Sequence, residues 1–138
     1  MSEAFLAPRW IWSAAIGFLL ASAASHAEPF VVHPDARGVQ SVEVSLDNYS
    51  YTPDHLIVKA GLPVIITLRN TAFLVPHNLV LTDPQAGFQL RQEVAAGESA
   101  RVVFTPEKRG VFTFYCDKKL LFLPSHREQG MEGRLEVR

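Results

Sequence analysis

The sequence has very little sulfur. It contains one cysteine, Cys116, and apart from the initiator one methionine, Met131, in 138 residues. A single cysteine cannot form a disulfide within the chain, which excludes a small disulfide-held domain. The sequence also lacks a charge excess, because 13 Lys and Arg residues face 14 Asp and Glu residues, for a net charge of −1. A nucleic-acid-binding protein usually carries a basic surplus, and none is present.

Low-complexity segments and internal repeats are absent too. The composition, with 48% hydrophobic and 20% charged residues, is that of a globular protein. It excludes a disordered tail or a collagen-like fibre. The length is enough for one domain.

No apolar run is long enough for a typical membrane span. The longest, Trp10–Ala24, has about 15 residues, whereas a spanning helix needs roughly 20. It follows Arg9 and ends at Ser25-His26-Ala27, a pattern typical of a secretory signal peptide. We therefore predict a signal peptide at residues 1–27 and a periplasmic or secreted domain at 28–138, without stable membrane insertion after cleavage. A retained anchor is the alternative.

Export affects how Cys116 is interpreted, because a free thiol is readily oxidised outside the cytoplasm. An unpaired cysteine in an exported protein indicates intermolecular pairing, a reactive thiol or a bond to a metal.

Residues 28–138 show no convincing helical period longer than about two turns. They contain short alternating or β-branched segments, separated by turn residues such as Ala60-Gly61. Strands are predicted at residues 39–46, 56–59, 63–69, 78–82, 88–94, 99–104, 110–115 and 133–137. Seven or eight short strands at this spacing predict an all-β fold, a Greek-key β-sandwich or barrel.

Four side chains could form a soft-metal site in such a fold: His77, Cys116, His126 and Met131. His77 lies at the start of a predicted strand, Cys116 directly follows another, and the other two lie in the next loop. Two imidazoles and a thiolate in a plane, with a weak axial thioether, form a blue-copper site that holds one ion as Cu(I) or Cu(II). Taken singly, each residue has a plainer explanation in the core or on the surface. The joint pattern favours the metal site.

The segments that carry these residues resemble the cupredoxins, the small blue copper proteins that include plastocyanin, azurin and pseudoazurin. The resemblance covers residues 40–138 and is carried by Pro76-His77-Asn78-Leu79-Val80-Leu81, by Gly110–Cys116 and by Gly130-Met131-Glu132-Gly133. It implies that His77, Cys116 and His126 are the strong copper ligands and Met131 the weak axial one. It also implies that hydrogen bonds around Asn78 hold the ligand loop in place.

The loop between the cysteine and the second histidine departs from the small carriers. Nine residues, Asp117–Ser125, separate Cys116 from His126, where those carriers keep only a few. The loop is more similar to those of cupredoxin domains in multicopper enzymes. A green or red copper site therefore stays open as an alternative to a blue one.

The same loop contains the apolar segment Leu120-Leu121-Phe122-Leu123-Pro124. Three interpretations stay open: it covers the copper, it folds into the core, or it presents an apolar patch to a partner. Lys118, Lys119 and Arg127 flank it and would suit an acidic redox protein that docks transiently. The candidate docking residues are Phe73, Lys118, Lys119, Leu121 and Phe122. The residues expected to keep water from the metal are Phe73, Leu74, Val75, Phe114 and Phe122.

These observations favour a monomeric, exported copper protein that transfers one electron and is not an enzyme. Two alternatives stay open: a protein that stores or delivers copper, and an accessory cupredoxin of a membrane redox complex. An oxidase or reductase would need a second histidine cluster, and a binuclear copper centre a second cysteine. A metal-free binding domain would leave Cys116, His126 and Met131 together without a reason.

Overall fold

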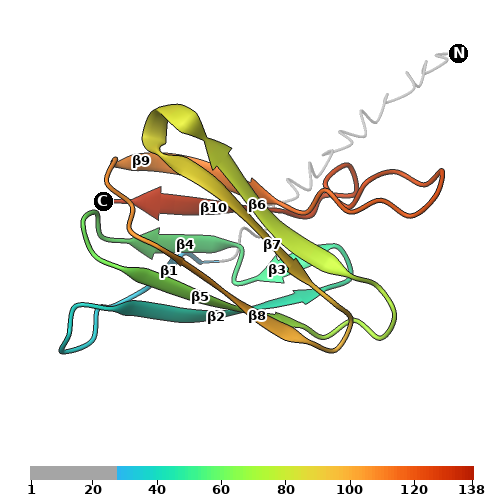
Figure 1. The fold of residues 1–138 in the computed structure, drawn as a ribbon, viewed down its shortest axis with the longest axis horizontal. Helices are drawn as coiled ribbons and strands as arrows, with labels where there is room; N and C mark the ends of the chain where they lie inside the picture. The colour runs from blue at the N-terminus through green and yellow to red at the C-terminus, as the bar shows by residue number, and fades with distance from the viewer. Residues whose placement is uncertain (1–27) are drawn as a thin grey trace, which may run out of the picture.

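The protein is a β-sandwich (Figure 1). A computed structural model describes residues 28–138, which form ten strands in two sheets and one short 3-10 helix. The predicted signal peptide at 1–27 lies outside the described residues. Within the described part, no helix is long and apolar enough to cross a membrane.

One sheet has six strands and the other has four. The first has the order β1 (Phe30–Val31), β4 (His55–Val58), β10 (Glu132–Val137), β9 (Gly110–Tyr115), β6 (His77–Asp83) and β7 (Phe88–Val94). The second has the order β3 (Ser50–Thr52), β2 (Gln40–Asp47), β5 (Val64–Asn70) and β8 (Ser99–Phe104). The helix η1 (Pro84–Ala86) joins β6 to β7. The all-β sandwich prediction is confirmed, and the short strands β1 and β3 add to the eight expected.

The sheets pack through the apolar half of each alternating strand. In β2, Val42, Val44 and Leu46 are buried while Ser41 and Glu43 are exposed, because successive side chains point to opposite faces. The start of β6 differs, since the residues His77–Leu81 are all buried. A side chain at the beginning of β6 is therefore shielded from solvent.

Strand pairing brings the two ends of the candidate site together. β6 and β9 are antiparallel neighbours, with Val80 opposite Tyr115. The start of β6 and the end of β9 consequently meet at one end of the sheet. β9 and β10 are antiparallel, with Tyr115 at the end of β9 opposite Glu132 at the start of β10. The loop between them therefore leaves and returns at that same end of the sheet. Figure 1 shows this loop projecting from the end opposite the C-terminus.

The strands and the described core residues lie between Phe30 and Val137. A chain that starts at Glu28 therefore contains both sheets in full.

Candidate metal centre

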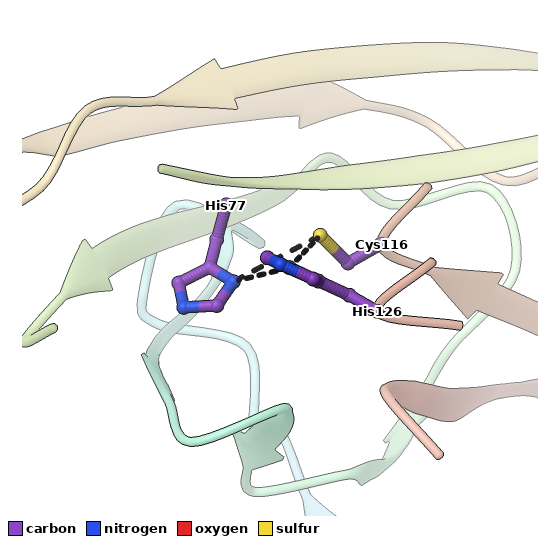
Figure 2. A group of neighbouring side chains, drawn as sticks. All are labelled: His77, Cys116 and His126. Carbon is purple, nitrogen blue, oxygen red and sulfur yellow. Dashed lines mark hydrogen bonds between the residues drawn. The ribbon is translucent and has the colours of Figure 1, made fainter. Parts of the chain in front are cut away.

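Three side chains converge at the end of the sandwich where the β9–β10 loop returns: His77, Cys116 and His126 (Figure 2). The Nδ1 atoms of the two histidines lie 3.1 Å apart. The Cys116 sulfur lies 3.3 Å from Nδ1 of His126 and 3.9 Å from Nδ1 of His77. All three side chains are buried.

The three donor atoms have the spacing of a single metal site. A triangle with sides of 3.1, 3.3 and 3.9 Å has its centre about 2.0 Å from each corner. Metal–imidazole bonds are about 2.0–2.1 Å long and metal–thiolate bonds about 2.3 Å. Two imidazoles with one thiolate are also the donor set of copper electron-transfer sites. The residues present therefore fit one copper ion.

Burial sets the protonation of the donors. It lowers the pKa of His77 to about 4, with a further contribution from His126, and it also lowers the pKa of His126. Both rings are thus neutral at neutral pH, and each can offer a lone pair. Burial raises the pKa of the Cys116 thiol. A metal that binds the sulfur must displace the thiol proton, so binding is favoured by higher pH.

A capped turn holds His126. Both the N–H and the hydroxyl of Ser125 donate to a Glu128 carboxylate oxygen at 2.7 Å, and the Glu128 N–H donates back to the hydroxyl at 3.2 Å. This is the reciprocal capping box of a helical turn. Its Ser-x-x-Glu spacing is visible in the sequence, but the sequence-based prediction missed it.

Met131 is tied to the other candidates through the main chain. Its N–H donates to the carbonyl of His126 at 2.9 Å, and its carbonyl accepts from the N–H of Cys116 at 3.1 Å. Its side chain is fully buried. These two hydrogen bonds place the fourth predicted ligand next to Cys116 and His126.

Asn78 links the strand that carries His77 to the cysteine. Its main-chain N–H lies 3.4 Å from the Cys116 sulfur, and its side chain is hydrogen-bonded to Asp117. The hydroxyl of Tyr51 donates to the Asn78 carbonyl at 2.6 Å from inside the core. Asn78 is therefore held by contacts with Cys116, Asp117 and Tyr51.

A charged network that the sequence-based prediction missed extends this link to β7. Arg91 donates to both carboxylate oxygens of Asp117 and to Glu93. Glu93 in turn accepts from Asn78 and pairs with Lys118. The Arg91 guanidinium, with Asn78, holds the pKa of Asp117 below its usual range. Arg91 and Asp117 are 26 residues apart, and no local pattern signals their contact.

Comparison with known families decides the identity. The cupredoxin-like domain family matches residues 12–130 of the sequence. The chain belongs to this family. No curated protein matches the chain by sequence.

Solved structures share the fold of this cupredoxin at low identity. Auracyanin A, a "blue" copper protein from Chloroflexus aurantiacus, has a TM-score of 0.58 and 20% identity over 73% of this chain and 100% of its own. The metal-binding domain of the Cu(I)-exporting P-type ATPase CopA of Streptococcus pneumoniae, solved with Cu(I), has a TM-score of 0.59 and 18% identity over 80% and 96%. A copper-containing nitrite reductase from Thermus scotoductus has a TM-score of 0.51 and 21% identity over 77% and 25%.

The apolar residues expected to shield the metal divide into two groups. In this cupredoxin Phe114 is buried and Val75 is half-buried. Phe73, Leu74 and Phe122 are 91%, 77% and 88% exposed, so for these three the expectation is wrong. The physical reason is that both of their loops project outward and do not fold over the site.

Tyr49 covers the second histidine instead. The ring centroids of Tyr49 and His126 lie 4.9 Å apart in an edge-on contact. Tyr49 is 37% exposed, whereas His126 is only 3% exposed. Tyr49 adopts a left-handed φ of 63°, which few residues other than glycine and asparagine take up readily. No sequence signal at this position predicted the contact.

Two of the five predicted docking residues, Lys118 and Lys119, line a groove. Its volume is about 420 Å³, and it is lined by Leu74, Val75, Pro76, Lys118, Lys119, Leu120 and His126. Leu120–Leu123 are exposed, so the interpretation that they fold into the core is wrong. Of the basic residues, Lys118 pairs with Glu93 and Arg127 with Glu132. Partner docking itself stays a prediction.

Proposed function

We propose that this cupredoxin is an exported, non-catalytic carrier of single electrons, with copper bound strongly by His77, Cys116 and His126 and weakly by Met131. The observation that carries this proposal is the buried triangle of two imidazole nitrogens and one sulfur. A copper ion held there supplies a Cu(I)/Cu(II) couple.

The fixed positions of the donors support a carrier. Main-chain hydrogen bonds join Met131 to both His126 and Cys116, and Asn78 reaches the cysteine sulfur. Donors held in this way keep one compromise geometry for both oxidation states, so little rearrangement accompanies the electron. A protein that must hand over the ion would benefit from a looser and more open site.

The route of the electron to the surface is short. His126 is buried, but its ring contacts the partly exposed Tyr49 and also forms part of the groove wall. An electron would therefore cross a single layer of side chains. The partner stays a prediction: a redox protein that docks transiently with a monomer of this chain.

The proposed periplasmic or secreted location rests on the sequence. It is supported by the signal-like pattern that ends at Ala27 and by the lone thiol of Cys116. Bound copper would protect this thiol from oxidation.

Copper storage or delivery is the second candidate. The fold it shares with the metal-binding domain of CopA, which was solved with Cu(I), favours it. The soft sulfur atoms of Cys116 and Met131 also suit Cu(I).

A redox cycle in the presence of a Cu(I) chelator separates the two candidates. A chain starting at Glu28 would be loaded with Cu(II), reduced, incubated with the chelator and reoxidised. A carrier recovers its full Cu(II) absorption over many cycles. Transfer of the copper to the chelator upon reduction would support delivery and contradict the carrier.

A further inference from the structure

The end of the molecule that carries the metal site also carries two apolar loop tips. The first tip is Phe73-Leu74, between β5 and β6, and the second is Leu120–Leu123, between β9 and β10. Phe73 and Phe122, one from each tip, are 91% and 88% exposed. Six of the eleven large apolar side chains that are exposed within residues 28–138 belong to these two tips.

The two tips lie side by side. Leu74 of the first and Leu120 of the second line the same groove of about 420 Å³. Figure 1 shows both loops at the end of the sandwich opposite the C-terminus. By contrast, Val103 and Val111 each lie singly on a strand. The tips therefore form a concentrated patch of the kind that marks an interaction surface.

Folding does not account for the apolar side chains at the tips. Leu121 has a φ of 49°, in the left-handed region where glycine or asparagine is less strained. Its side chain is 79% exposed and so gains little from the core of the protein. A leucine that adds strain and gains little burial indicates a contact made outside the chain.

We propose that the two tips insert into the surface of a bilayer that contains anionic lipids, which attaches the protein peripherally with its metal end toward the membrane. Leu and Phe are side chains that enter the boundary between headgroups and acyl chains. Lys118 and Lys119 directly precede the second tip and line the groove at its base. Lysine side chains at this level extend their ammonium groups to lipid phosphates.

The residue types favour a bilayer over a protein as the occupant. The tips consist of four leucines and two phenylalanines, which offer no hydrogen-bonding side chain. Protein interfaces concentrate their binding energy in Trp, Tyr and Arg and under-use Leu. Lys118 is already paired with Glu93, so charge adds only a modest increment to the apolar insertion.

Vesicle flotation tests the proposal on the chain starting at Glu28, both metal-free and copper-loaded. The vesicles consist of phosphatidylcholine alone or mixed with phosphatidylglycerol. The wild type is expected to bind both, and more tightly when phosphatidylglycerol is present. The double variant Leu121→Ser/Phe122→Ser is expected to bind at least about tenfold more weakly, because two inserted apolar side chains are lost.

A matched control separates tip insertion from general surface hydrophobicity. Val103→Ser/Val111→Ser removes two side chains that are 63% and 62% exposed on strands, and binding should stay within twofold of wild type, about the scatter of surface changes. Equal losses in the control and the tip variant would overturn the proposal. So would a wild type that binds neither vesicle, which would leave the tips to a protein partner.

Fluorescence reports the depth of insertion. Both tryptophans, Trp10 and Trp12, precede residue 28, so Phe122→Trp places a single tryptophan at the second tip. Its emission should shift to shorter wavelength with vesicles, and an unchanged emission would contradict insertion. The copper absorption band, measured on the same variants, tests the electron-carrier proposal separately, because neither Leu121 nor Phe122 is a candidate ligand.

Discussion

Asn78 and Asp117 are joined by two hydrogen bonds that run in opposite directions. The Asn78 side-chain amide donates to the Asp117 carboxylate at 2.8 Å, and the Asp117 N–H donates to the Asn78 side-chain oxygen at 3.1 Å. The pair lies directly beside Cys116, whose sulfur faces the N–H of Asn78. It therefore fixes the distance between the strand that carries His77 and the segment that carries the thiol.

Replacing Asn78 should loosen this link. In Asn78→Ala, the part-buried N–H of Asp117 loses its acceptor, and the free energy of unfolding should fall by about 1 kcal/mol. The main-chain N–H of Asn78 remains but is less firmly placed, so the sulfur-to-copper absorption band should also shift. Urea unfolding and visible spectroscopy measure the two effects. Gln92→Ala, which removes an exposed hydrogen bond on β7, is the control and should alter neither.

The capping box at Ser125 should contribute to the position of His126. Ser125→Ala removes the hydroxyl that accepts from Glu128 N–H, and a lost helix cap costs about 1 kcal/mol. Copper should also bind more weakly, because the turn that holds His126 frays. Ser41→Ala, at an exposed position of β2, is the matched control. A copper affinity equal to that of wild type would show that the turn is held by other contacts.

The metal-free protein should lose stability in weak acid. The pKa of His77 is lowered by burial from 6.5 to about 4, so between these values the unfolded chain binds the extra proton. Stability from this group is full above about pH 6.5 and declines as the pH falls toward 4. Urea midpoints at pH 7 and pH 5 measure the decline. In His77→Gln, the urea midpoints at pH 7 and pH 5 should differ less than in the wild type. A difference equal to that of the wild type would assign the loss of stability to other groups.

Met131 is predicted to be a weak axial ligand. Met131→Leu should therefore retain copper while the reduction potential rises, because the loss of one electron donor and a more apolar site destabilise the more highly charged Cu(II) more than Cu(I). Voltammetry of the copper-loaded protein measures the potential, and metal analysis measures the copper content. Loss of copper from the variant would mean that Met131 is an essential ligand.

The regular part of the fold was predictable because its signals are local. The strands at 88–94, 99–104 and 110–115 agree with the structure to the residue, since each has a Gly or Pro at, or within two residues of, one of its ends. β3 was missed because its turn places Asn48 and Tyr49 in left-handed conformations without a glycine to indicate it.

The candidate site was predictable by residue type but not by environment. A histidine, a lone cysteine, a second histidine and a methionine in this order suggest one chemistry, so the donors could be named. The covering of His126 by Tyr49 and the link from Arg91 to Asp117 depend on contacts between distant segments. The direction of Leu120–Leu123, outward and not inward, was left open because apolar loops occur in both arrangements.

The central claim is that the Cys116 thiolate binds copper together with His77 and His126. The most direct measurement is the visible absorption and electron paramagnetic resonance spectrum of the Cu(II)-loaded chain starting at Glu28, compared with Cys116→Ser. A strong sulfur-to-copper band in the wild type that is absent from the variant is the predicted result. A wild type without this band, or a variant that keeps it, would contradict the account.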